Sequence, residues 1–84
     1  MVMTTPESIR SAIEAGIACE RVSVRGDGQH FEALIVSQAF EALSKVRRHQ
    51  LVYGALGTRM REEIHALSMR TLTPAEWSAR SEPR

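Results

Sequence analysis

The sequence predicts one small α+β domain with the element order α-β-β-α-α-β-α, in which helices cover one face of a three-stranded mixed sheet. Three observations lead to this fold class. Isoleucines recur every four residues near the start of the chain, and a glycine-rich turn then joins two short strand-like segments. Two further helical patterns separate this hairpin from a last alternating segment, and a mixed sheet is the economical way to join them.

The length of the chain suits a single domain that spans residues 1–84. A chain of this size buries only about 60% of the surface that it exposes when unfolded. Apolar residues make up 43% of the sequence and charged residues 25%, which is enough for one hydrophobic core. We expect a domain of marginal stability, with a loose tail beyond Arg80.

The first element is predicted to be an amphipathic helix. Thr5 has the character of an N-cap, with proline at the first helical position and glutamate in the first turn. Ile9, Ile13 and Ile17 then recur every four residues and form one apolar face. Gly16 falls near the end of this helix.

Two strands are predicted to follow as a hairpin. Residues 21–25 alternate between valine and polar side chains, which is typical of a half-buried strand. Gly26-Asp27-Gly28 is a turn signal. Residues 31–36 form an almost continuous apolar run that indicates a buried strand.

The middle of the chain predicts two helices. Residues 37–43 form a connection, Ser44 is a plausible N-cap, and the helical pattern that follows is interrupted at Gly54. After a tight corner over residues 54–57, Leu56, Met60 and Ile64 recur every four residues and predict a third helix.

The last elements are predicted to be a strand and a short helix. Apolar and polar side chains alternate over residues 66–71, which favours a third strand. Thr73 and Glu76 have the spacing of a capping box, with proline at the first helical position. The helix that they open contains Trp77, whose ring we expect to pack against the sheet.

Several classes of protein are not favoured. The apolar runs are far shorter than the roughly 18 residues that span a bilayer, and residues 1–5 lack a leader pattern, so we expect a cytoplasmic protein. The single cysteine, Cys19, can form neither an internal disulfide nor a Cys-x-x-Cys pair. The chain has no recognisable nucleophile motif, P-loop or metal-binding acid pair, so we expect no enzymatic activity.

Basic residues cluster in the middle of a nearly neutral chain, whose formal net charge is +1. No acidic residue lies between Glu41 and Glu62. That interval contains five basic residues, namely Lys45, Arg47, Arg48, Arg59 and Arg61. They could form a surface for phosphate or for an acidic protein, or simply a solvated helix face. Residues 54–57 also spell Gly-x-x-Gly, the nucleic-acid clamp of KH domains, but the two middle residues are apolar and the signal is weak.

Five segments together resemble the successive signature segments of the BolA family. They are Gly-Asp-Gly-Gln-His-Phe at 26–31, Phe-Glu-Ala-Leu-Ser at 40–44, Arg-His-Gln-Leu-Val-Tyr at 48–53, Ile-His-Ala-Leu-Ser at 64–68 and Thr-Leu-Thr-Pro-Ala-Glu-Trp at 71–77. The resemblance spans nearly the whole chain. Its closing part, Ile-His-Ala followed by Thr-Pro-x-x-Trp, is the most specific, and the segment at 26–31 resembles one bacterial branch of the family.

The resemblance implies a fold related to the type II KH domain and a partnership with monothiol glutaredoxins around a shared two-iron, two-sulfur cluster. In that picture the glutaredoxin and glutathione each supply a thiolate, and the BolA-like protein supplies one or two side chains. His65 matches the family's C-terminal ligand histidine. The second ligand of the family comes from the loop between the first two strands, where His30 is the candidate. Cys19 matches no ligand position.

The resemblance therefore makes an iron–sulfur adaptor with a role in stress response the leading hypothesis. The isolated chain is expected to lack the cluster and to be a monomer or a weak homodimer. Without the resemblance, His65 reads as a strand-start histidine with backbone partners and His30 as a turn residue. His49 is assigned to the structure or to the partner surface. The alternative function is a nucleic-acid-binding regulator that uses a helix-turn-helix-like pair over residues 44–64.

Overall fold

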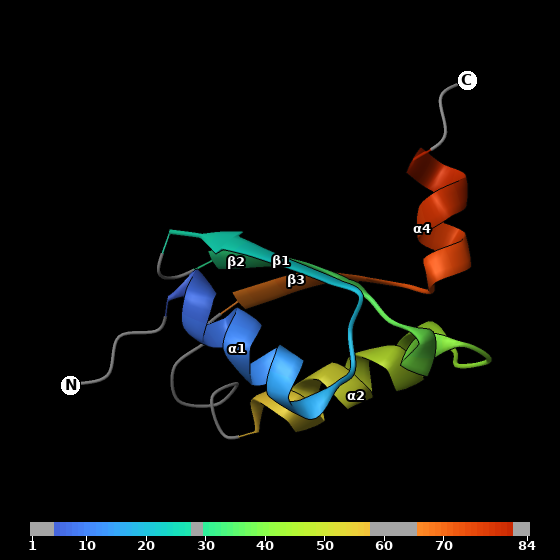
Figure 1. Cartoon of the computed structure of the whole chain (residues 1–84). Coiled ribbons are helices and arrows are strands. Elements are labelled where there is room, and N and C mark those ends of the chain that lie inside the picture. The colour runs from blue at the N-terminus through green and yellow to red at the C-terminus, as the bar shows by residue number, and fades with distance from the viewer. Residues whose placement is uncertain (1–4, 28–29, 58–65, 82–84) are drawn as a thin grey trace.

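The computed structural model describes residues 5–27, 30–57 and 66–81, and it confirms the α+β class (Figure 1). The elements follow the order α1 (Pro6–Gly16), β1 (Arg21–Gly26), β2 (His30–Val36), η1 (Gln38–Phe40), α2 (Lys45–Leu56), β3 (Ala66–Leu72) and α4 (Pro74–Ser81). The predicted third helix, through Met60 and Ile64, lies outside the described residues, and its expected first turn at Leu56 belongs to α2. No helix in the described ranges is long and apolar enough to span a membrane.

The three strands form a mixed sheet in the order β1-β2-β3, as the sequence predicts. β1 and β2 are antiparallel neighbours and pair Val24 with Ala33. β2 and β3 are parallel neighbours and pair Ala33 with Met69. β2 is therefore the central strand, and its register fixes the positions of both neighbours.

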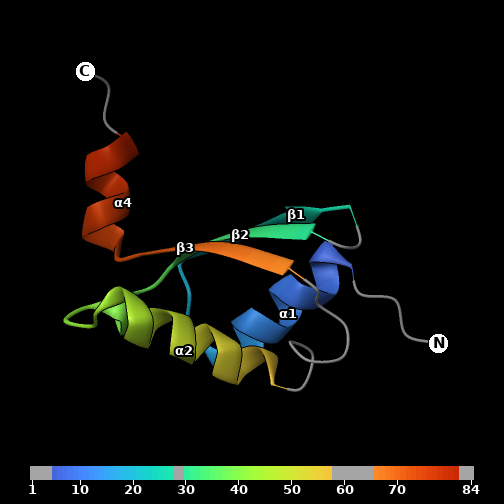
Figure 2. The ribbon, with the colours of Figure 1, turned by 180° about the vertical axis from the view of Figure 1, so that it is seen from behind.

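The hydrophobic core lies between this sheet and the helices α1 and α2, which cover one face of it (Figures 1 and 2). Its buried members are Ile9, Ile13, Ile17, Phe31, Ala33, Ile35, Phe40, Val52 and Leu56. Alternate residues of β2 point into this core, whereas Glu32 is exposed and Leu34 is only half-buried. The predicted fully buried strand is thus buried on one face, because no described helix covers the middle of the other.

All three predicted helix caps are confirmed. The Thr5 and Ser8 hydroxyls each accept a hydrogen bond from the other residue's N–H, both at 3.1 Å. The Ser44 hydroxyl accepts from the N–H of Arg47 at 3.2 Å. At α4, the Thr73 hydroxyl accepts from the Glu76 N–H at 3.1 Å, and the Glu76 carboxylate accepts from the Thr73 N–H at 2.8 Å. Each cap satisfies N–H groups that the first helical turn leaves unpaired.

The predicted end of the second helix at Gly54 is wrong. α2 continues to Leu56, and Gly57 caps it with a φ of 62° and an N–H that donates to the Tyr53 carbonyl at 2.9 Å. A glycine inside a helix costs only about 1 kcal/mol, whereas fully burying a Val or Leu side chain gains about 1.5–3 kcal/mol. Val52 and Leu56 are both buried on the sheet side of α2, so packing outweighs the local penalty.

The last helix lies apart from the two helices that cover the sheet. α4 follows the end of β3 and rises on the side of the sheet opposite α1 and α2, as both views show (Figures 1 and 2). Its Trp77 ring lies against the Arg21 guanidinium of β1, whose carbon is 5.0 Å from the ring centroid. Trp77 therefore packs on a residue of the sheet, as expected, through its uncovered side.

The glycines near the end of α2 offer a matched test of the helix boundary. A Cβ at Gly54 or at Gly57 would meet no atom within 4 Å, so only the backbone distinguishes the two positions. Gly54→Ala should stabilise the fold by about 0.5–1 kcal/mol, because its backbone is helical. Gly57→Ala should destabilise it by about 1–2 kcal/mol, because its φ is positive. Urea denaturation measures both, and a destabilising Gly54→Ala would contradict the longer helix.

Candidate metal centre

His30 lies where the hairpin closes, at the first position of β2. Its N–H donates to the Asp27 Oδ1 at 2.9 Å, and the Asp27 N–H donates to the His30 carbonyl at 3.2 Å. These two bonds hold the backbone of His30 in place. The residue itself is exposed, so its imidazole can reach a ligand or a second molecule.

Gly26 allows the hairpin to close this tightly. A Cβ at Gly26 would collide with the His30 carbonyl oxygen and with the Phe31 ring. A residue without a side chain is therefore needed next to the histidine. The glycine of the turn signal is thus required for steric reasons, and the tight turn that it allows positions His30, the predicted ligand.

The strand register relates His30 to the start of β3. His30 pairs with Ala66, which directly follows His65 in the sequence. His65 itself lies outside the described residues. Because side chains alternate along a strand, His30 belongs to the same face of β2 as Glu32 and Leu34, the face opposite α1 and α2.

The described residues offer few donors for a metal ion. Among residues 5–27, 30–57 and 66–81, no group of three or more His, Cys, Asp or Glu side chains could hold one. An open hollow beside His30 is lined by Arg25, Gly26, Asp27 and Glu32 as well. An imidazole nitrogen suits iron, so a centre that includes His30 needs ligands from outside this set or from another molecule.

Cys19 does not contribute to this end of the sheet. It precedes β1, whereas His30 lies beside the last residues of that strand. Its thiol is half-buried and donates to the Ile17 carbonyl at 3.3 Å. Burial and then the charge of Glu14 raise the pKa of the Cys19 thiol, which disfavours the thiolate that binds metals.

His49 is part of α2 rather than of the candidate centre. It is half-buried, and its ring meets the Tyr53 ring edge to face at a centroid distance of 6.5 Å. This contact agrees with its assignment to the structure or to the partner surface. His49 is consequently a suitable control when the other histidines are replaced.

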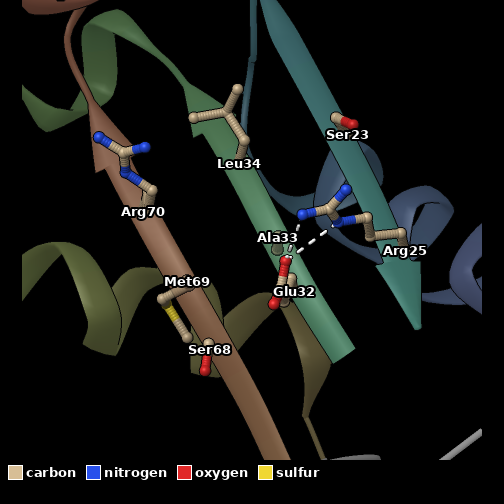
Figure 3. A pocket seen from close by; sticks show the side chains of 8 residues that line it. All are labelled: Ser23, Arg25, Glu32, Ala33, Leu34, Ser68, Met69 and Arg70. Carbon is tan, nitrogen blue, oxygen red and sulfur yellow. Dashed lines mark hydrogen bonds and ion pairs between the residues drawn. The ribbon is translucent and has the colours of Figure 1, made fainter. Parts of the chain in front are cut away.

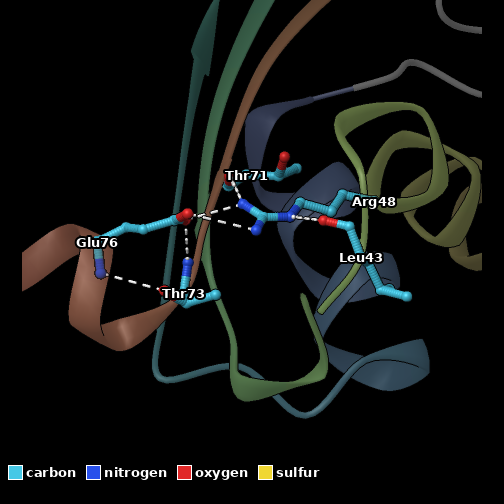
Figure 4. A network of polar contacts seen from close by, with 5 residues as sticks. All are labelled: Leu43, Arg48, Thr71, Thr73 and Glu76. Atoms are coloured by element: carbon cyan, nitrogen blue, oxygen red, sulfur yellow. Dashed lines mark hydrogen bonds and ion pairs between the residues drawn. The ribbon is translucent and has the colours of Figure 1, made fainter. Parts of the chain in front are cut away.

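Only part of the predicted basic surface faces solvent. Lys45 and Arg47 are exposed, and Arg59 and Arg61 lie outside the described residues. The Arg48 side chain is just 12% exposed, and its guanidinium points toward Thr71 and Glu76 (Figure 4). Arg48 is therefore removed from the set of phosphate contacts that the sequence suggests.

Arg48 joins four segments of the chain. Its Nε donates to the Leu43 carbonyl and its Nη1 to the Thr71 carbonyl, each at 2.9 Å. Nη1 also donates to Glu76 Oε1 at 2.8 Å, and Nη2 to Oε2 at 3.4 Å. The side chain links α2, the preceding connection, β3 and α4 (Figure 4). A sequence pattern could not reveal this role, since the partners are distant along the chain.

The chain is a small α+β domain with an exposed histidine at one end of its sheet. The chain belongs to the BolA family, whose model, described as BolA-like protein, matches residues 7–76. It is 38% identical over 71 residues to the acid stress protein IbaG of Escherichia coli, which covers 83% of this chain and 84% of that protein. The segment at 26–31 resembles the branch that contains IbaG.

Two further comparisons extend this result. The chain is 43% identical over 60 residues to the DNA-binding transcriptional regulator BolA of Haemophilus influenzae, covering 71% of this chain and 58% of that one. The structure of a BolA protein homologue from Coxiella burnetii matches with a TM-score of 0.82 and 47% identity, over 90% of this chain and 99% of that one. These names describe a stress protein and a regulator rather than an enzyme.

The Arg48–Glu76 contact should make stability depend on pH. Hydrogen bonds from Arg48 and from the Thr73 N–H hold the pKa of the Glu76 carboxyl below its usual range. Because the folded-state pKa is lowered, the stabilisation is complete above the usual glutamate pKa and disappears as the pH falls through the lowered value. Glu76→Gln should lower the Tm at pH 7. The difference in Tm between this variant and the wild type should become smaller in acid.

The exposed Arg25–Glu32 pair provides the control for this measurement. Its side chains are 83% and 64% exposed, so water and salt screen the contact. Glu32→Gln should change the thermal midpoint little at either pH. A Glu76→Gln protein as stable as the wild type at neutral pH would refute the structural role of the contact.

Proposed function

We propose that this BolA-family chain is a non-enzymatic iron–sulfur adaptor that binds a monothiol glutaredoxin. In this proposal it helps to ligate a two-iron, two-sulfur cluster that is shared with the glutaredoxin and with glutathione. His65 and His30 supply its ligands. The adaptor acts in iron–sulfur assembly and trafficking or in iron regulation, and the likeness to an acid stress protein supports a role in stress response.

The observation that supports this proposal most directly is the pairing of His30 with Ala66 across β2 and β3. It assigns the loop histidine and the residue that follows His65 to the same end of the sheet. Neighbouring strands lie about 4.8 Å apart, a separation compatible with two ligands to one iron. Asp27 and Gly26 keep the His30 backbone at this position.

The number of ligands proposed for this chain favours a cluster shared with another molecule over a metal site formed by this chain alone. His30 and His65 are at most two ligands, and each two-iron, two-sulfur cluster needs four. In this proposal the remaining two are one thiolate of the glutaredoxin and one of glutathione. Two histidines in place of two thiolates raise the reduction potential of such a cluster, as in Rieske centres.

Replacing the histidines one at a time tests the assignment. His65→Ala and His30→Ala should each change the visible absorption and circular dichroism of the cluster in the mixed complex, since each removes an iron ligand. His49→Ala should leave the spectra as in the wild type. Identical spectra for His65→Ala and His49→Ala would contradict the ligand role of His65.

A second candidate function is binding of nucleic acid by the helix-turn-helix-like segment over residues 44–64. Two observations favour it, namely the exposure of Lys45 and Arg47 on α2 and the relative named a DNA-binding transcriptional regulator. The internal role of Arg48 leaves at most four of the five basic residues for phosphate contacts. This number supports only modest affinity.

Binding to duplex DNA distinguishes the two candidates. We expect weak, non-selective binding at physiological salt, with a Kd of roughly 10⁻⁴ to 10⁻⁶ M that rises steeply as salt is added. If nucleic-acid binding were the main function, binding would stay sequence-selective at this salt and Arg59→Gln and Arg61→Gln would weaken it; we expect neither. Fluorescence anisotropy measures this, and submicromolar, sequence-selective binding would favour the regulator over the adaptor.

A further inference from the structure

The face of the sheet opposite α1 and α2 forms an open surface with a regular composition. The strand registers place its side chains in rows across the sheet. One row contains Ser23, Leu34 and Arg70, and the next contains Arg25, Glu32 and Ser68. Together they line an open hollow of about 480 Å³ (Figure 3). We call this surface the open face.

The open face has a positive charge. Arg25 pairs with Glu32 across neighbouring strands, with Nη2 to Oε1 at 2.9 Å, so these two charges largely cancel. Arg70 forms no ion pair within the described part of the chain. Arg21 adds a further charge at the α4 end, where it stacks on Trp77. The excess of positive charge on the open face favours the binding of an acidic partner.

The middle of the open face is apolar. Leu34 is half-buried at the centre of its row, between Arg70 and Ser23, and is exposed enough to be covered by another molecule (Figure 3). An apolar centre with an arginine-rich, polar rim is typical of protein interfaces. Single-stranded nucleic acid would instead need exposed aromatic rings for stacking, and the Trp77 ring is already in contact with Arg21.

The open face is continuous with the candidate metal centre. Arg25 and Glu32 line both the hollow around Leu34 and the hollow beside His30. His30 also belongs to this side of β2, since it is two residues from Glu32. A protein that reaches His30 from this side would cover the open face as well.

We propose that the open face is a docking surface for an acidic protein, with Arg70 as its main charged contact and Leu34 as its apolar centre. The identity of that protein rests on the proposed function: it is the partner that brings the cluster to His30. The surface binds through charge and apolar contact, so docking does not require the cluster.

Charge reversal tests this surface separately from the cluster. The wild-type chain is titrated by calorimetry with a monothiol glutaredoxin that lacks a cluster, at low and at high salt. Arg70→Glu should raise the Kd by about tenfold or more, because it places like charges together at the interface, and Arg70→Gln by less. Lys45→Glu makes the same charge change on α2, across the sheet, and should alter the Kd by less than about twofold.

Two readouts separate failure of this inference from failure of the proposed function. Unchanged circular dichroism of Arg70→Glu establishes that the variant is folded. A wild-type complex that Lys45→Glu weakens and Arg70→Glu does not would overturn the docking surface. A complex that Arg70→Glu weakens, but in which cluster-loaded glutaredoxin keeps its spectrum on mixing, would support the surface and contradict the shared cluster. No binding of the wild type to the cluster-free glutaredoxin would overturn the docking surface, and mixing with the cluster-loaded glutaredoxin would then test the shared cluster by itself.

Discussion

The alternation of side chains along β2 determines what lies on each face of the sheet. Phe31, Ala33 and Ile35 enter the core beneath α1 and α2, so the intervening residues must face the other way. β2 also pairs with both other strands, and a shift of one residue would exchange its two faces. The same alternation therefore builds the core, directs His30 to the uncovered side and leaves Leu34 at the centre of the open face.

A second constraint is the contact between Arg48 and Glu76, which connects the helix layer to the helix on the opposite side of the sheet. Arg48 reaches past the end of β3 to Glu76, whose carboxylate also caps α4. A charged group with little exposure must be paired and hydrogen-bonded, and the carbonyls of Leu43 and Thr71 complete its partners. The residue is thus structural, although the sequence places it within a basic cluster.

Local signals made most of the fold predictable. Caps such as Ser44 depend on a few neighbouring residues. Strands with one buried face alternate apolar and polar residues, which can be read from the sequence. The prediction that α2 ends at Gly54 was wrong, because the packing of the whole helix decides whether a glycine interrupts it. The roles of Arg48 and Leu34 depend on partners or empty space that lie far along the chain. For the candidate site, family motifs indicated His30 and His65, while the position of His30 opposite Ala66 needed the strand register.

Pulsed electron paramagnetic resonance of the reduced mixed complex tests whether histidines of this chain bind the cluster iron. The chain would be labelled with ¹⁵N-histidine and mixed with unlabelled, cluster-loaded monothiol glutaredoxin. We expect ¹⁵N couplings to the reduced cluster from two histidines of this chain, and these couplings should persist in His49→Ala. A complex whose cluster shows no coupling to any labelled histidine would contradict the role of His30 and His65 as ligands.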